Sequence, residues 1–401
     1  MSKTAVVHPF NGPFLKDFVL APELLPLQDE EIKKLDSDLA DYEQLFLNPD
    51  IERHLITRNE LLASFAISKA EASGLTLSEA QAVYECILKN KAYKFVAEKL
   101  KKGLKLIRKD HDKLEFFNIA KTFRLLNSER FNLKDLKAEF VQDLHRQLTQ
   151  GLDIFQSYLP EFEPYRSGKW RNNNLIRVGW YVPADFNAVE RGVEELISYV
   201  KTDPSPTKIA VFHTALYALH PFSNGNKRVC RILEHLLLRS LGLNRKNLYS
   251  SSYYYHKEKT RYYKYLLYSL ERKNLNHFVS FVDEALALSM VSVVQLSLQS
   301  KRNDFLVPQV EGIRTVLKPL VKRRQLQFKN LFRRVKRKMA RQTFVNYLQQ
   351  AADLNLVERR RKGRSTYYRL NLKAPEGKTL DVWLETLSGK LAYIPDEIRN
   401  G

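Results

Sequence analysis

This sequence of 401 residues has little cysteine, no long apolar run and no recognisable secretory signal. Its two cysteines, Cys86 and Cys230, are too few for a disulfide framework and too far apart for a metal-ligand pair. The first residues lack the charged stretch, apolar core and small-residue cleavage site of a signal peptide. No apolar run approaches the length of about 18 residues that a membrane span needs. We therefore expect a cytoplasmic protein in a reducing setting, with no membrane partner.

Acidic residues are scarce in one part of the chain. Residues 301–373 contain 21 Lys and Arg against four Asp and Glu, which is a net charge of +17 out of +21 for the whole sequence. A charge spread evenly would indicate a solvated surface, whereas a charge concentrated in this way indicates a polyanionic partner.

The apolar residues recur with a helical period along most of the chain. Residues 30–47, 133–152 and 187–202 repeat them every three to four positions. The exception lies between Gly168 and Pro183, where Asn172-Asn-Asn separates two short extended-looking pieces. This pattern predicts a small β-hairpin in a fold that is otherwise mainly α.

The stretch from Thr207 to Gly242 predicts a helix, a loop and a second helix. The first helix runs up to His220, and the following proline argues against its continuation. Residues 223–225, Ser-Asn-Gly, are typical of a turn, and the second helix begins near Asn226. The beginning of a helix offers free backbone N–H groups and the positive end of its dipole, so it binds phosphate well.

Two arginines lie in the first turns of the second helix. Arg228 and Arg231 are three positions apart and therefore share one face, which can hold a di- or triphosphate. Each feature alone is ordinary, because a His after a helix usually caps or packs and helical arginines are usually solvated. The joint spacing HPFxxGNxRxxR is specific.

That string resembles the signature of the Fic family, His-x-Phe-x-acid-Gly-Asn-Gly-Arg-x-x-Arg. The resemblance extends over roughly residues 20 to 290 and includes a flap-like segment, YRSGKWRNNNLIRVGWYVPAD, and a base-site-like segment, LYSSSYYYHKEKTRYYKYL. It implies a helical Fic fold with a short β-hairpin flap. It also implies transfer of AMP from ATP, with Mg²⁺, to a Ser, Thr or Tyr hydroxyl of a protein, which can be the enzyme itself.

The resemblance assigns roles that agree with the chemistry of the residues. His220 would be the general base that accepts the proton of the hydroxyl. The backbone amides of Gly225 and Asn226 would form the anion hole, and Arg228 and Arg231 would hold the β- and γ-phosphates.

Two positions depart from the family pattern. Asn224 stands where most members have an acid, so it would be a weak, uncharged ligand for Mg²⁺. Lys227 replaces the second Gly and joins the phosphate-binding set, as in the Doc branch, which transfers the γ-phosphoryl group. Doc proteins lack the second arginine, which this chain retains as Arg231. Adenylylation is therefore favoured, and phosphorylation or an inactive site remains an alternative.

An inhibitory segment is predicted near residues 67–76. The stretch 61–85 resembles the N-terminal inhibitory motif of the family, and alignment of Leu75-Thr76-Leu77 places Glu71 at its glutamate. The resemblance implies that Glu71 pairs with Arg231 and blocks the γ-phosphate. The match is loose, since Ile67, Ala70 and Ala72 depart from it, and the alternative is an ordinary exposed acid of a helix.

The pattern changes from Val307 onward. Three helical pieces precede two alternating strands around Lys362-Gly363, which predicts a winged helix-turn-helix at 305–373 that binds duplex DNA. The predicted base contacts come from the third helix: Arg341, Gln342, Asn346 and Gln349. The predicted phosphate or minor-groove contacts come from the wing: Arg359, Arg360, Arg361, Lys362 and Arg364. A protein-binding winged helix is the alternative.

The predicted organisation has four parts. An N-terminal helical region (1–130) precedes the Fic core (131–298), the winged helix-turn-helix (305–373) and a tail (374–401) for which we predict no element. Three hypotheses follow: an adenylyltransferase inhibited by Glu71, which can also act as the reverse hydrolase; a Doc-like kinase; and a DNA-binding regulator whose degenerate Fic body binds nucleotide without chemistry. A homodimer is compatible with all three.

Overall fold

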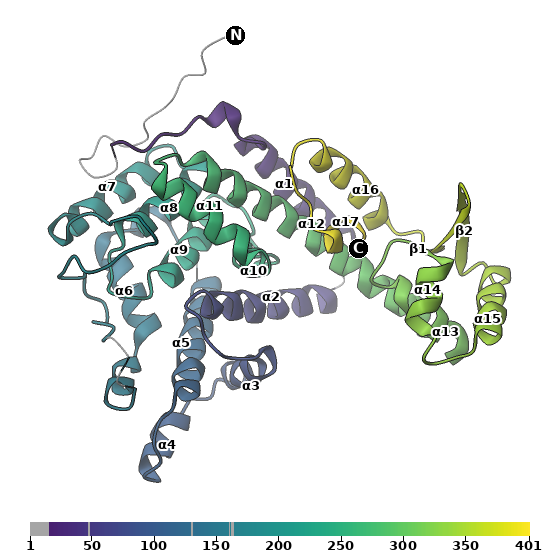
Figure 1. Cartoon of the computed structure of the whole chain (residues 1–401), viewed down its shortest axis with the longest axis horizontal. Coiled ribbons are helices and arrows are strands. Elements are labelled where there is room, and N and C mark those ends of the chain that lie inside the picture. Colours follow the sequence, from purple (N-terminus) through teal and green to yellow (C-terminus); the bar gives the residue numbers. More distant parts are fainter. Residues whose placement is uncertain (1–15, 47–48, 130, 160, 162–163) are drawn as a thin grey trace. The chain divides into compact units, whose positions relative to one another are not determined.

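The structure is a computed structural model that describes residues 16–46, 49–129, 131–159, 161 and 164–401 (Figure 1). The chain forms two compact units. The first comprises the chain up to Asp38 together with Arg53–Ser289, and the second comprises Leu39–Glu52 together with Met290–Gly401.

The first unit is built from helices. They are α1 (Asp29–Phe46, which ends within the second unit), α2 (Pro49–Lys69), α3 (Leu77–Leu88), α4 (Phe95–Lys101), α5 (Arg108–Ser128), α6 (Ala138–Thr149), α7 (Val189–Lys201), α8 (Pro206–Leu219), α9 (Asn226–Ser240), α10 (Ser251–Lys257), α11 (Lys259–Glu271) and the beginning of α12 (Asn276–Leu306). Short 3-10 turns lie at Pro22–Leu24, Leu133–Asp135, Leu152–Ser157 and Phe186–Ala188.

Helix α8 forms the centre of this unit and packs against α7 and α9 (Figure 1). All its residues from Ile209 to Leu219 are buried, as expected for a helix that is apolar on every side. The Ser205 hydroxyl caps its beginning by accepting from the backbone N–H of Lys208. In the core, His213 Nδ1 lies 2.5 Å from a carboxylate oxygen of Glu234, which fixes α8 against α9.

Helix α12 is more apolar than the sequence pattern indicated. A window of 18 residues has a mean hydropathy of 1.5, so by length and composition alone it passes for a membrane span. However, 83% of that window is buried within the protein. Such burial is typical of a core helix, and polar groups such as Arg302 near its end form hydrogen bonds within the fold.

The β-hairpin predicted at residues 168–183 is not formed, and this prediction was wrong. The described segment has one isolated antiparallel bridge, between Val178 and Tyr181. The asparagines of the run use their side chains instead, because Asn173 accepts from the N–H of Leu175 and Asn174 from the N–H of Phe186. Such local bonds compete with a strand ladder.

The second unit contains a mixed helix and sheet segment followed by two more helices. In order these are α13 (Glu311–Leu317), the 3-10 turn Lys318–Leu320, β1 (Leu326–Gln327), α14 (Phe328–Val335), α15 (Arg341–Asp353), β2 (Val357–Lys362), β3 (Ser365–Leu370), α16 (Pro375–Ser388) and α17 (Asp396–Arg399). The three strands pair antiparallel in the order β1-β3-β2. The predicted basic hairpin is therefore present, and Gly363 turns it with φ of 60°.

The core of this unit lies between the helices and one face of the sheet. Phe344 of α15 is fully buried and packs edge-on against Phe328 and close to Phe332 of α14. Leu348 and Ala351 of α15 are also buried, as the helical period predicted. Residues 374–401, for which we predicted no element, form α16 and α17, and Trp383 and Leu387 of α16 are buried.

Candidate active site

The loop between α8 and α9 is closed by one side chain. The amide of Asn226 donates to the carbonyl of Phe222 at 2.8 Å and accepts from its N–H at 3.0 Å. Gly225 begins α9 with φ of 75°, in the left-handed region that favours glycine. A Cβ there would lie 3.0 Å from Arg228 Nη2 and 3.3 Å from His145 Nε2. The loop therefore needs both Gly225 and Asn226 for its shape.

His145 of α6 packs against this loop, and no feature of the sequence pattern indicated its role. Its Nδ1 accepts from the backbone N–H of Gly168 at 3.0 Å, so Nε2 carries the proton and donates to the carbonyl of Asn224 at 3.3 Å. The ring stacks on Phe222 with centroids 3.8 Å apart. Burial lowers the pKa of His145 to about 3, with the charge of Arg228 acting in the same direction.

His220 stands where α8 ends. Its φ of 51° places a residue with a Cβ in the left-handed region, which is a strained conformation often found at functional sites. Its Nδ1 lies 3.2 Å from the carbonyl of Tyr217, so Nδ1 is the protonated nitrogen and Nε2 keeps its lone pair. Burial lowers the pKa of His220 to about 4, which leaves the imidazole neutral at neutral pH.

Arg171 positions His220 and was also missed, because nothing in its local pattern distinguishes it. Its Nε donates to the carbonyl of His220 at 2.8 Å, and its Nη1 donates to the carbonyl of Asn173 at 2.8 Å. Its backbone N–H binds the carbonyl of Pro221 at 2.8 Å. Arg171 therefore ties the segment after Gly168 to the loop that carries His220.

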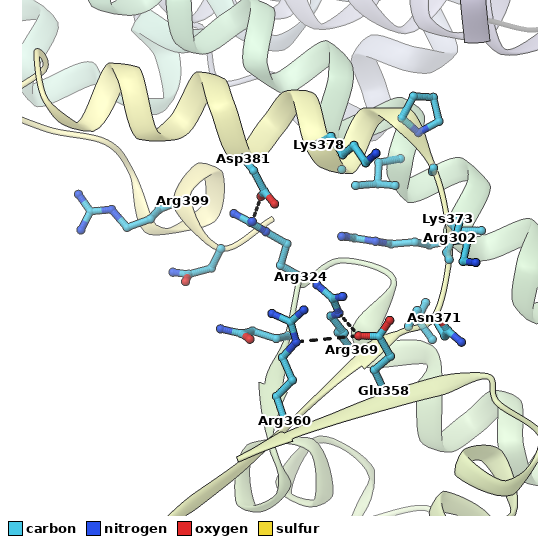
Figure 2. A pocket seen from close by; sticks show the side chains of 18 residues that line it. Arg302, Arg324, Glu358, Arg360, Arg369, Asn371, Lys373, Lys378, Asp381 and Arg399 are labelled. Carbon is cyan, nitrogen blue, oxygen red and sulfur yellow. Dashed lines mark hydrogen bonds and ion pairs between the residues drawn. The ribbon is translucent and has the colours of Figure 1, made fainter. Parts of the chain in front are cut away.

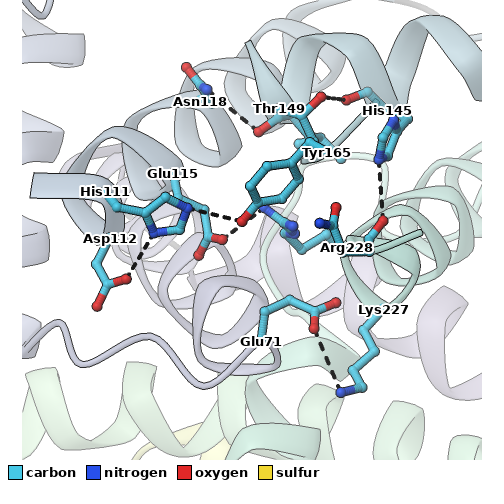
Figure 3. A network of polar contacts seen from close by, with 12 residues as sticks. Glu71, His111, Asp112, Glu115, Asn118, His145, Thr149, Tyr165, Lys227 and Arg228 are labelled. Atoms are coloured by element: carbon cyan, nitrogen blue, oxygen red, sulfur yellow. Dashed lines mark hydrogen bonds and ion pairs between the residues drawn. The ribbon is translucent and has the colours of Figure 1, made fainter. Parts of the chain in front are cut away.

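The two motif arginines lie on the buried side of α9, but they have different surroundings. Arg228 forms an ion pair with Glu115 of α5 at 2.8 Å and lies over the ring of Tyr165 (Figure 3). Burial raises the pKa of Glu115 to about 7, against the opposing charge of Arg228. Glu115 is a third residue that the sequence did not reveal, since its role depends on a partner 113 positions away.

Arg231 is 2% exposed and has no carboxylate partner among the described residues. Its Nη1 donates to the carbonyl of Ala66 at 3.1 Å, and its guanidinium lies 4.5 Å from the ring centroid of Tyr262. In the part of the chain that the structure describes, the Nε of both Arg228 and Arg231 lacks a hydrogen-bond partner. Both side chains therefore keep donors for a further ligand.

Glu71 lies against the first turn of α9. It belongs to the turn that follows α2, not to a helix, and its carboxylate is 3.6 Å from the ammonium of Lys227 (Figure 3). Burial favours the neutral acid, but Lys227 and Arg228 outweigh it and hold the pKa of Glu71 below its ordinary value. The backbone N–H of Lys227 also binds this carboxylate. Glu71 thus occupies an anion site at the beginning of a helix.

The predicted pair of Glu71 with Arg231 is not formed. The carboxylate contacts Lys227, which stands at the position of the family's second Gly, while Arg231 bonds to a backbone carbonyl. The carboxylate of Glu71 binds there because the ammonium of Lys227 and the first backbone N–H groups of α9 lie nearer to it than the guanidinium of Arg231. Ala72 follows with φ of 62°, which explains why the family motif has Gly there.

A magnesium ion fits this loop poorly. Asn224 offers a neutral amide, its backbone carbonyl accepts from His145, and the nearby carboxylate of Glu71 is held by Lys227. Among the described residues no three His, Cys, Asp or Glu side chains form a group that could hold a metal. Magnesium usually needs one or two carboxylates besides the phosphates of its substrate.

Residues 135–238 match the sequence model of the Fic/DOC family. The match covers His220, the anion loop and both arginines, and it excludes Glu71. Together with the fold it supports a Fic family protein.

Two solved structures have a similar fold. A Fic family protein from Desulfovibrio desulfuricans G20 has a TM-score of 0.50 and 18% identity, and the similarity covers 86% of this chain and 96% of that chain. Residues 134–508 of Fic-1 from C. elegans have a TM-score of 0.50 and 16% identity, covering 68% of this chain and 73% of that chain. At these identities the likeness concerns the fold alone.

The residues predicted to contact DNA lie on α15 and the β2–β3 hairpin of the second unit. On α15, Gln342 donates to Asn346 at 3.0 Å, four positions on. The exposed positions are Arg341, Gln342, Asn346, Gln349, Arg359, Arg360, Arg361 and Arg364. The side chain of Lys362 lies outside the described part.

The buried neutral histidine under the loop predicts a loss of stability in mild acid. The pKa of His145 is about 3 in the folded protein, whereas its ordinary value is 6.5. As the pH falls, the unfolded state therefore binds a proton at this residue before the folded state does. Stability is complete above pH 6.5 and decreases below it, by roughly 2 kcal/mol for this residue at pH 5. The free energy of urea unfolding, measured at pH 7 and pH 5, should show this decrease.

The variant His145→Asn should reduce that pH dependence by about the same amount, whatever its effect on absolute stability. The matched control is His54→Asn at an exposed position of α2, which should leave it unchanged. An equal pH dependence in the wild type and in His145→Asn would contradict the assignment of a neutral buried His145.

Proposed function

We propose that this protein transfers AMP from ATP to a side-chain hydroxyl of a protein. The observation that carries the proposal is the placement of a neutral His220, with Nε2 available, next to the beginning of α9 and two buried arginines. The family match adds support, because Fic domain proteins are generally AMP transferases or related nucleotidyl- and phosphotransferases.

In the proposed reaction, Nε2 of His220 accepts the proton of the incoming hydroxyl. The hydroxyl oxygen forms a bond to the α-phosphorus, and the bond to the β-phosphate oxygen breaks, so pyrophosphate leaves. The bond from Nδ1 to the Tyr217 carbonyl keeps the base in the required tautomer. The bond from Arg171 to the carbonyl of His220 holds the strained backbone in place.

The leaving pyrophosphate would bind at the beginning of α9. The free backbone N–H groups there and the unused donors of Arg228 and Arg231 are suited to two further phosphates. Glu115 keeps the guanidinium of Arg228 in position. Preorganised donors of this kind stabilise the charge that develops in the transition state.

Glu71 would keep this reaction slow. Its carboxylate binds Lys227 through the ammonium and the backbone N–H, so it takes the place of a phosphate oxygen. ATP therefore competes with a tethered anion for the same donors. The inhibition would act through Lys227 in this chain, although the family resemblance implied Arg231.

Lys227 is also the observation that favours the second candidate, a Doc-like transfer of the γ-phosphoryl group. An ammonium at the start of α9 binds a terminal phosphate in either orientation of the nucleotide. Arg231 favours AMP transfer, because a second guanidinium is useful mainly when two phosphates beyond the reacting one must be held. A regulator that binds nucleotide without chemistry is the third candidate.

ATP labelled at the α- or γ-phosphate separates these candidates. We expect label from the α-phosphate, and none from the γ-phosphate, in the protein itself or in an added protein acceptor. His220→Ala should abolish incorporation and leave ATP binding nearly unchanged, since other residues form the anion site. The control His54→Ala, at an exposed position of α2, should keep full activity. Incorporation of label from the γ-phosphate alone would make the protein a kinase. Incorporation of neither label would support a regulator that binds nucleotide without chemistry.

Release of the tethered anion should accelerate the reaction. Glu71→Gln keeps the size of the side chain but removes its charge, so we expect at least a tenfold increase in AMP incorporation, about 1.4 kcal/mol of restraint. The control Glu85→Gln changes an exposed acid of α3 and should have no effect. An unchanged rate, with equal ATP binding in both forms, would argue against inhibition by Glu71.

For the second unit we propose a winged helix that binds duplex DNA. The element order α13-β1-α14-α15-β2-β3, the three-stranded antiparallel sheet and the exposed Arg341, Gln342 and Asn346 of α15 support this proposal. The net charge of +17 over residues 301–373 supplies the attraction to phosphate. A protein-binding winged helix is the alternative outcome.

Binding of a labelled 30-base-pair duplex should weaken steeply as salt rises, because several phosphate contacts release counterions. Arg341→Ala and Arg361→Ala should each weaken binding at least threefold, whereas Lys318→Ala, an exposed control in the same unit, should change it little. AMP incorporation should be unaffected by all three. Binding that does not depend on salt, or no binding to any duplex, would indicate a protein partner instead.

A further inference from the structure

The second unit contains a polar cavity apart from the proposed DNA-binding face of α15. Its volume is about 950 Å³, within the range of sites for small molecules. It is lined by the end of α12, one face of the β2–β3 hairpin and the beginning of α16 (Figure 2). No residue of the first unit lines it.

The lining has a large excess of positive charge. Seven Arg and Lys line the cavity against two acids, Glu358 and Asp381. Both acids already form ion pairs with arginines. A carboxylate oxygen of Glu358 lies 2.6 Å from Nε of Arg369, and Asp381 pairs with Arg324 (Figure 2). In the described part of the chain, no Asp or Glu side chain forms an ion pair with four of the cations: Arg302, Lys373, Lys378 and Arg399.

Arg302 is the least expected of these cations, because it is only 7% exposed. Its Nη1 donates to the carbonyl of Val321 and to a main-chain oxygen of the terminal residue Gly401, both at 3.3 Å, which fixes the guanidinium in place. Burial and the neighbouring Arg324 lower the pKa of Arg302 to about 10. A buried guanidinium next to a second one is costly unless an anion is bound there.

The beginning of α16 adds a second kind of anion donor. This helix of 14 residues has no side-chain cap at Ala374, and Pro375, Gly377 and Lys378 of its first turn line the cavity. Uncapped N–H groups and the positive end of the helix dipole favour an anion, in particular phosphate. Guanidinium groups bind phosphate through two parallel N–H donors.

We propose that this cavity binds a small molecule that carries two or more phosphate groups. The size of the cavity admits a nucleotide-sized compound, and the excess of positive charge in its lining suits more than one anionic group.

The alternation of side chains along β2 separates this site from DNA binding. The register pairs Glu358 with Arg369, and both side chains line the cavity together with Arg360, two positions along β2 on the same face. Arg359 and Arg361 lie on the opposite face with Val357. A small anion can therefore bind without displacing two of the wing residues that we assign to DNA.

Tripolyphosphate is the probe for the test, with hydrogen–deuterium exchange of the full chain as the readout at 0.15 M salt. We expect protection of backbone amides in residues 369–381. The double variant Arg360→Gln/Lys378→Gln, which changes two exposed side chains, should weaken this binding at least tenfold. Arg333→Gln, an exposed position of α14 outside the cavity, should weaken it less than twofold.

Protection confined to the region of Arg228 and Arg231 would place the anion at the other site and overturn the proposal. So would equal weakening by Arg333→Gln, since it would indicate attraction by general charge. Protection of residues 369–381 by duplex DNA and not by tripolyphosphate would assign this face to nucleic acid instead. The readout is local to the second unit, so failure of the proposed AMP transfer would leave it unaffected.

Discussion

The first turn of α9 is the constraint on which the proposed active site depends. The amide of Asn226 closes the loop onto Phe222, and Gly225 allows the backbone to enter the helix in the left-handed region. This geometry leaves the first N–H groups of α9 facing the same space as His220 and Glu71. Loss of either contact would therefore change the positions of His220, the anion site and Glu71 together.

The anion site is filled by the protein's own carboxylate. Lys227 lies beside the buried Arg228, whose own counter-charge is Glu115, so the carboxylate of Glu71 stabilises the resting state by balancing the charge of Lys227. Under the proposed inhibition, a substrate that carries more negative charge than one carboxylate would displace it.

The sequence predicted those features that depend on neighbouring positions. The helical period of the apolar residues, the turn residues and the local spacing predicted three features: the helix–loop–helix around His220, α15 with its buried Phe344, and the hairpin around Gly363. Arg171, His145 and Glu115 were missed because their partners are distant in the sequence. The hairpin at 168–183 was wrong because asparagine side chains replaced ladder bonds, and the partner of Glu71 was wrong because Lys227 lies nearer.

The alternation along β2 has a consequence for how this protein can diverge. Adjacent residues such as Arg360 and Arg361 point to opposite sides of the sheet. Substitutions at Glu358 and Arg360 alter the side that lines the cavity, and those at Arg359 and Arg361 alter the opposite side. Under the two proposals for this unit, specificity for the small anion and specificity for DNA would therefore depend on different residues of one strand.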